Sequence, residues 1–310
     1  MANRYWRKKA LISKIETTYG TDPTPTGATD AILAHDINLR PLQSQKVERP
    51  HDTPFFGSRP AILTNVHVAL SFGVEIAGAG TAGDAPAYGP LLRACGLAET
   101  LTATTDAQYD PVSTGIESVG NYLNIDGVQQ KILGYRANLQ MSFRPSALST
   151  FTFDGLGLFT TPTDTAAPIV DVSGFQVPVP VSDANTDFTV NGVAVPMEEL
   201  TFDFGNQVNA IFRVGEEKVS IVDRKVSGSM LVKADTLAIF DPFTIARNRT
   251  QVPIQVVHGI TAGNIVQVDA DLCELDEPQY QESNGEVMYR IPFMAVPSDA
   301  GDDEIKITVK

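Results

Sequence analysis

One glycine pattern in the chain matches a nucleotide-binding motif. Gly78-Ala79-Gly80-Thr81-Ala82-Gly83 has the spacing G-x-G-x-x-G, which lets a backbone approach a pyrophosphate at the start of a helix. The motif needs a helix directly after its third glycine, and Asp84-Ala85-Pro86-Ala87 interrupts one there. The flanking runs also favour meandering β-structure over a βαβ unit. We therefore interpret residues 78–83 as a loop and predict no cofactor-binding residues.

The four histidines do not have the spacing of a metal site. His35, His51, His67 and His258 include no pair four residues apart and no neighbouring cysteine. Neither His67 nor His258 has both an acid and a nucleophile close by in the sequence, so the sequence suggests no catalytic triad around either histidine. We interpret all four as solitary surface or edge residues.

Three acidic groups could in principle bind a hard cation through oxygen ligands. They are Asp269-Ala270-Asp271, Asp276-Glu277 and Asp302-Asp303-Glu304, and none lies in an EF-hand-like loop, so we interpret them as solvated turns and strand ends. Cys95 and Cys273 are far apart, outside any C-x-x-C pattern, and are expected to be reduced core residues. The sequence thus predicts no catalytic, cofactor-binding or metal-binding residues, and no enzyme.

Composition indicates a folded, acidic protein. Hydrophobic residues make up 43% of the 310 residues and charged residues 19%. With 23 basic and 37 acidic residues the formal net charge is −14, which argues against stable nucleic-acid binding. No run approaches the length of a membrane span, and Ala10-Leu11-Ile12 is too short for a signal-peptide core. We expect a soluble intracellular product without a membrane partner.

The first half of the chain is predicted to be an arm followed by strands. Residues 1–58 begin with a basic segment, continue with Pro, Gly and Thr, and are interpreted as an N-terminal arm. Residues 61–76 predict a strand, with apolar residues alternating from Val66 to Phe72. Residues 88–96, with Pro90 in the first turn and Gly96 at the end, predict a short helix. After this helix, strands are predicted over residues 118–125, 129–143 and 149–159, with Asp126-Gly127 as the hairpin turn between the first two.

The second half repeats this order after a proline-rich stretch. Residues 161–186 are interpreted as a linker, which divides the chain into a first module over 59–160 and a second over 187–310. Residues 199–214 and 218–232 predict a hairpin, and Asp241-Pro242 starts a short helix through about residue 248. The last predicted strands are 252–257, 265–272, 287–295 and 305–309. Strands, one helix and more strands occur in each half, so we expect a repeated fold.

Four segments make the chain resemble the tail tube proteins of long-tailed bacteriophages, of the type with two modules in about 300 residues. They are residues 14–23, residues 89–100, residues 257–266 and residues 302–310. The resemblance covers nearly the whole chain. It implies a mainly β fold with two tandem β-sandwich or barrel modules, each with one short flanking helix.

The resemblance also implies what the protein assembles with. Subunits would join their inner strands into a β-barrel around a lumen, with a pseudo-sixfold ring of three two-module copies preferred over a ring of six, and rings would stack head to tail. The partners would be other copies of the chain and the tail tip or baseplate, tape measure and tail terminator proteins. DNA would pass without specific binding, because an acidic wall repels phosphate. The location would be the virion tail, after assembly in the host cytoplasm.

The residues alone leave the part played in the virion open. We expect the strands near 66–76, 129–143, 199–214 and 218–232 to line the lumen, and residues 1–58 to reach a neighbouring ring. A tail terminator or a baseplate hub would have a similar composition. A carbohydrate-binding β module is a further alternative, although the single tryptophan, Trp6, lies in the basic N-terminal segment and suggests no stacking platform.

Overall fold

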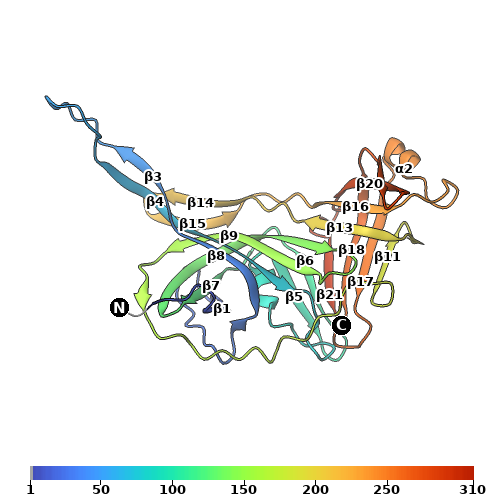
Figure 1. The fold of residues 1–310 in the computed structure, drawn as a ribbon, viewed down its shortest axis with the longest axis horizontal. Coiled ribbons are helices and arrows are strands. Elements are labelled where there is room, and N and C mark those ends of the chain that lie inside the picture. Colours follow the sequence, from blue (N-terminus) through green and yellow to red (C-terminus); the bar gives the residue numbers. More distant parts are fainter. Residues whose placement is uncertain (1–2) are drawn as a thin grey trace.

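A computed structural model describes residues 3–310, and it confirms a mainly β fold (Figure 1). The strands of the first half are β1 (Lys9–Ile15), β2 (Ala31–Ile32), β3 (Ala34–Glu48), β4 (Ala61–Glu75), β5 (Leu97–Thr102), β6 (Asp106–Pro111), β7 (Val119–Ile125), β8 (Val128–Phe143), β9 (Thr150–Phe159) and β10 (Thr163–Asp164). Those of the second half are β11 (Thr186–Val190), β12 (Val193–Ala194), β13 (Met197–Asp203), β14 (Val208–Arg213), β15 (Glu216–Ile221), β16 (Ser227–Lys233), β17 (Val252–His258), β18 (Val266–Leu275), β19 (Gln279–Ser283), β20 (Glu286–Ala295) and β21 (Lys306–Val309). The helices are α1 (Gly89–Arg93) and α2 (Pro242–Asn248). Within residues 3–310, neither helix is long and apolar enough to cross a membrane.

Both helices lie where proline and cap residues predict them. α1 has a proline in its first turn, and so does α2, whose N-cap Asp241 accepts hydrogen bonds from the backbone N–H groups of Phe243 and Thr244. Arg249 then ends α2 in the left-handed conformation. α1 follows β4 and α2 follows β16, so each half places its helix after the second strand of a hairpin.

One sheet runs through both halves of the chain. Its strands, from one edge to the other, are β3, β4, β9, β8, β13, β16, β20 and β19, each antiparallel to its neighbours. The halves meet where residues 140–143 of β8 pair with residues 200–203 of β13. We call this eight-stranded layer the shared sheet.

Other strands cover one face of the shared sheet and enclose the core. In the first half β2, β1 and β7 lie side by side, and β7 continues to the first part of β8. In the second half the order is β11, β17, β18 and β21, and β21 also pairs with β6 of the first half. Alternate side chains of the shared sheet point into the core, for example Leu70 and Phe72 of β4 and Phe202 of β13. The alternation from Val66 to Phe72 therefore marks a half-buried strand.

The N-terminal segment differs from the expected arm over residues 1–58, of which 1–2 lie outside the described residues. β1 pairs along its whole length with β7, and Leu11 and Ile12 are buried. β3 then forms an edge of the shared sheet. Only the hairpin between β3 and β4 projects beyond the rest of the molecule (Figure 1). The sequence pattern misses β1 for a physical reason. Side chains on both faces of β1 are buried, so apolar residues occupy neighbouring positions and no alternation of apolar and polar residues appears.

The hairpin predicted over 199–232 is present but interrupted. β13 pairs with β16, and β14 pairs with β15 around Gly215, which has a positive φ of 89°. Residues between these pairs leave the shared sheet, so that β14 and β15 form a separate ribbon that lies over β9 and β8 (Figure 1). Residues 161–186, the expected linker, contain β10, a β-bridge from Pro180 to Leu148 and the first residue of β11. Most of the remaining linker residues lack regular structure and are exposed or half-buried.

Candidate functional surface: the shared sheet and its two free edges

The face of the shared sheet that points away from the core is polar. Its central strands carry short uncharged side chains and two acids at alternate positions: Asn138, Gln140, Ser142, Thr150, Thr152, Asp154, Thr201, Asp203, Ser227 and Ser229. All of them are exposed or half-buried. We call these ten residues the polar face. Because the opposite face is the hydrophobic core, only the polar face is available to water.

Hydrogen bonds between side chains strengthen the joint of the two halves. The Asp203 carboxylate accepts hydrogen bonds from the amide nitrogens of Asn138 (2.7 Å) and Gln140 (2.8 Å) on β8. The Asn138 oxygen in turn accepts from the backbone N–H of Asn206 at 2.9 Å. Backbone pairing between β8 and β13 is thus continued by the side chains on the polar face.

Positive charge beside the polar face is partly neutralised. Glu199 on β13 forms ion pairs with Arg144 and with Arg290, the latter at 3.0 Å. Partial burial acts to raise the pKa of Glu199, but the hydrogen bonds from Arg290 and Arg144 outweigh it, so the pKa lies below its ordinary value. The carboxylate therefore stays charged at neutral pH and offsets one of the two guanidinium charges.

The shared sheet ends in two unpaired strands. β3 pairs only with β4, and β19 pairs only with β20, among residues 3–310. Both are strands whose outer backbone groups have no partner strand in the described chain. A free edge of this kind pairs readily with another strand, which proteins either prevent or use for assembly. β3 contains Pro41 and register shifts on either side of Gln43, and both features hinder unspecific pairing.

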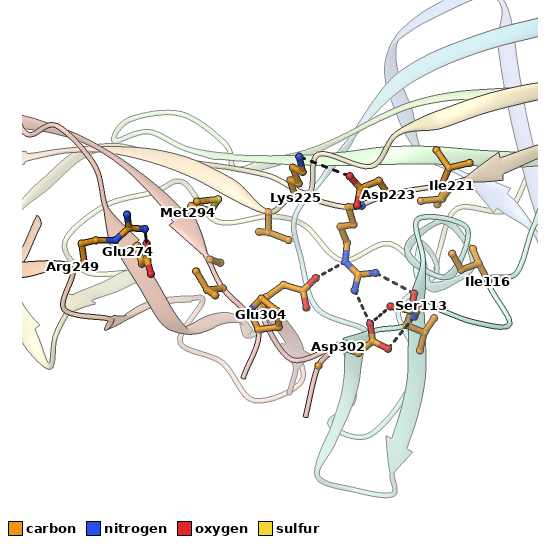
Figure 2. A pocket seen from close by; sticks show the side chains of 18 residues that line it. Ser113, Ile116, Ile221, Asp223, Lys225, Arg249, Glu274, Met294, Asp302 and Glu304 are labelled. Atoms are coloured by element: carbon orange, nitrogen blue, oxygen red, sulfur yellow. Dashed lines mark hydrogen bonds and ion pairs between the residues drawn. The ribbon is translucent and has the colours of Figure 1, made fainter. Parts of the chain in front are cut away.

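A cleft of about 660 Å³ lies between the halves, and its charged side chains neutralise one another (Figure 2). Arg224, whose side chain is only 10% exposed, pairs with Glu304 at 2.5 Å and with Asp302 at 3.0 Å. Arg224 also donates to the backbone oxygen of Val112, and Ser113 donates to Asp302. Partial burial acts to raise the pKa of Asp302, but the hydrogen bonds from Ser113 and Arg224 lower it further than burial raises it. This network connects the two halves of the chain.

The glycine motif forms a loop, as expected, and the loop has a structural contact. The N–H of Gly78 donates to the side chain of Asn264 at 2.6 Å, and the N–H of Gly80 donates to the backbone oxygen of Gly263 at 2.7 Å. A Cβ at Gly78 would lie 2.2 Å from that Gly263 oxygen. The small residues are needed because two loops from the two halves cross here.

His35 forms a 2.9 Å contact with the carboxylate of the neighbouring Asp36, an isolated pair rather than a cluster. Within the described residues, no group of three or more His, Cys, Asp or Glu side chains could hold a metal ion. His67 contacts Phe212 of the β14–β15 ribbon, and His258 is buried beside Thr186. Cys95 and Cys273 are buried free cysteines, as expected. Burial raises the pKa of both thiols, to about 12 for Cys273.

Two elements of this surface escape the sequence analysis. β3 falls within the expected arm, and β19 is not predicted at all. The turn after β19 contains Asn284-Gly285, both at positive φ, and Asn-Gly is the strongest short-range hairpin signal in a sequence. That pair could have identified both β19 and the start of β20. β3 offers only the short alternation around Ile37 and Leu39 before Pro41.

One known protein family matches nearly the whole chain. A search of curated proteins finds no match. A family model described as phage tail tube protein matches residues 6–295, which is nearly the whole chain and includes most of the shared sheet. The resemblance predicted from the sequence is confirmed. The chain belongs to the phage tail tube protein family and is a structural protein of the phage tail.

Proposed function

We propose that three copies of the chain join their shared sheets into a closed ring, and that rings stack head to tail into a hollow tube. The observation that carries the proposal is the shared sheet itself, which ends in the free strands β3 and β19 on opposite sides. Closing a sheet on itself removes its edges, and a contact between unlike surfaces generates a ring or a filament. Two modules per chain, each with four strands of the shared sheet, favour three copies over six.

The polar face is proposed to line the lumen. The core face is packed against the second layer, so the polar face alone can border a water-filled channel. Its short Ser, Thr, Asn and Gln side chains offer no fixed positive charge, and Asp154 and Asp203 repel phosphate. DNA would therefore slide through without specific binding. Of the segments expected to line the lumen, β4, β8, β13 and β16 belong to the shared sheet, whereas the β14–β15 ribbon does not.

Stacking is assigned to the projecting hairpin between β3 and β4. Its tip over residues 49–60 carries Phe55 and Phe56, which are 77% and 109% exposed. Exposed aromatic side chains on a protruding segment mark a contact with another molecule. We propose that this tip, in place of the whole of residues 1–58, reaches the neighbouring ring. The chain then acts by assembly, without catalysis.

We propose the remaining partners on the basis of the family. The first and last rings of a tube would contact the tail tip or baseplate and the tail terminator, and the tape measure protein would occupy the lumen during assembly in the host cytoplasm. The two modules would be units around residues 59–160 and 187–310, connected by 161–186, with β1 completing the first.

Negative-stain electron microscopy of the purified protein at rising concentration tests the proposal. Hollow tubes whose end views show threefold symmetry are expected, and true sixfold rings of six chains would contradict the copy number. A single ring that never stacks would favour a terminator or hub. Deleting residues 51–59 should leave rings but abolish stacking, and tubes of unchanged length would contradict the role of the tip.

A further inference from the structure

A second, mainly apolar pocket lies just beyond the paired ends of β8 and β13. Its volume is about 430 Å³. Three of its lining side chains are buried, one is half-buried, and the two charged ones are exposed carboxylates. We call the following six lining residues the end pocket: Val181, Asp183, Asp187, Phe188, Val195 and Met197.

The end pocket and the projecting hairpin lie at opposite ends of the shared sheet. β4 begins at Ala61 beside the hairpin tip and ends at Glu75, which pairs with Thr150 of β9. Thr150 in turn pairs with Ser142 near the end of β8, and the pocket-lining residue Pro145 follows directly after that strand. The hairpin between β3 and β4 is thus at one end of the molecule, and β11, which contributes to the pocket, is near the other (Figure 1). Head-to-tail stacking brings such unlike ends together.

The charges of the tip and of the end pocket are complementary. Over residues 49–60 the tip carries Arg49 and Arg59 against one acid, Asp52. The charged residues of the end pocket are Asp183 and Asp187. Among residues 3–310, none of these five side chains lies within 4.0 Å of an oppositely charged group. Complementary charges on two surfaces guide their association and disfavour contacts between like surfaces.

The size and lining of the end pocket suit an aromatic side chain. Pockets that enclose a small organic group have volumes of about 300–1,000 Å³ and mostly apolar walls with a few polar groups. Phe55 and Phe56 are the exposed aromatic residues of the tip, and they lie in the chain between its two arginines. Aromatic anchors that fill a pocket on the partner contribute much of the binding energy of a protein interface.

We infer that the end pocket of one copy receives the hairpin tip of a copy in the adjacent ring. Phe55 or Phe56 enters the apolar part of the pocket, and the tip arginines face Asp183 and Asp187. The inference rests on the proposed stacking of rings, and it identifies the surface that the tip contacts. Because the pocket lies beside the joint of β8 and β13, it is complete only where the two halves of a chain meet.

Charge reversal on both sides of the contact tests this inference. Asp183→Arg/Asp187→Arg brings arginines of the pocket to those of the tip, and it should raise the protein concentration needed for tube growth by about tenfold while rings still form. Arg49→Glu/Arg59→Glu should have the same effect from the other side. The variant with all four substitutions should recover tube growth to within about threefold of the wild type, because opposite charges face each other again.

Two further variants separate the contact from a general effect of charge. Asp84→Arg/Asp299→Arg makes the same change in net charge at two exposed acids outside the end pocket and should leave tube growth unchanged. Phe55→Ala/Phe56→Ala should stop stacking without changing any charge. Sedimentation separates tubes from rings, and negative-stain microscopy identifies both.

The outcomes distinguish this inference from the proposed function. Normal tubes of the Asp183→Arg/Asp187→Arg variant would overturn the inference alone and leave the end pocket to another partner. Failure of the combined variant to regain tubes would overturn the pairing of the arginines with the two carboxylates. A wild-type protein that forms rings but never stacks would contradict the proposed function, and this inference with it.

Discussion

The buried carboxylate of Glu16 provides a sensitive test of how the N-terminal segment is fixed to the first module. Glu16 is 7% exposed, and its two oxygens accept three hydrogen bonds. One oxygen accepts from the backbone N–H of Gly134 at 2.6 Å, and the other accepts from the N–H of Gly20 and the hydroxyl of Ser118, both at 2.7 Å. Gly134 belongs to β8 and Ser118 to the segment before β7, so these bonds hold β1 and the following loop against β7 and β8.

The loss of unfolding free energy on substituting Glu16 depends on how many hydrogen-bond donors are left without an acceptor. Glu16→Gln keeps one oxygen for Gly20 and Ser118 but turns an amide N–H₂ toward the N–H of Gly134, which should cost about 2 kcal/mol of unfolding free energy. Glu16→Ala removes the acceptor for all three donors and should cost about 4 kcal/mol. Glu217→Gln on the exposed end of the β14–β15 ribbon is the matched control, expected to change stability by less than about 0.5 kcal/mol.

Urea unfolding of the monomeric variants, followed by circular dichroism, measures these differences. The unfolding midpoint should decrease in the order control, Gln, Ala, with an unchanged slope. Burying a charge is itself costly. Replacing a buried charged side chain by an uncharged one of the same shape can therefore leave the unfolding free energy unchanged or raise it. A Glu16→Gln variant as stable as the wild type would therefore refute the view that the three donors require a carboxylate.

Three further predictions concern pH, the junction of the halves and the polar face. Burial lowers the pKa of His258 below 6.5, so its contribution to stability should be complete above pH 6.5 and be lost as the pH falls; urea midpoints between pH 8 and 5 should decline less in His258→Gln, and parallel profiles would contradict this. Arg224→Gln leaves the 8% exposed Glu304 without its cation and should lower the unfolding free energy by about 3 kcal/mol. Lys225→Gln, at a side chain 71% exposed, should have little effect. Equal decreases of the thermal unfolding midpoint in the two variants would refute the role of the Arg224 network. Assembled tubes of Asp154→Lys should retain a short fluorescent DNA duplex on pelleting at low salt, unlike tubes of the charge-matched Asp187→Lys on β11; equal retention would argue against the polar face as the lumen wall.

Local signals in the sequence predict the elements that depend on local physics. Asp241 and Pro242 locate α2 to the residue, because a side-chain cap and a fixed φ act within one turn. Asp126-Gly127 locates the β7–β8 turn, where both residues have a positive φ. The alternation of β4 records a strand with one buried face. Each of these elements is stabilised by interactions between residues that are close together in the chain.

The elements missed by the sequence depend on distant contacts. β1 carries three consecutive buried residues, Leu11, Ile12 and Ser13, so its burial follows from strands more than a hundred residues away rather than from a period of two. The joint of β8 with β13 involves polar side chains whose pairing no local pattern specifies. β19 is polar because its side chains are exposed or half-buried on both faces. Assembly surfaces are hard to recognise for this reason: their partners lie outside the sequence window.

The joint between β8 and β13 changes the thermodynamics of forming a ring. In the proposed ring, every second junction between modules lies within one chain, and residues 161–186 keep its two sides at a high effective concentration. Such a junction forms during folding and costs no translational or rotational freedom at the time of association. Only the junctions between chains depend on the amount of protein present. A ring of fused pairs should therefore form at a lower subunit concentration than a ring of separate modules with the same strand contacts.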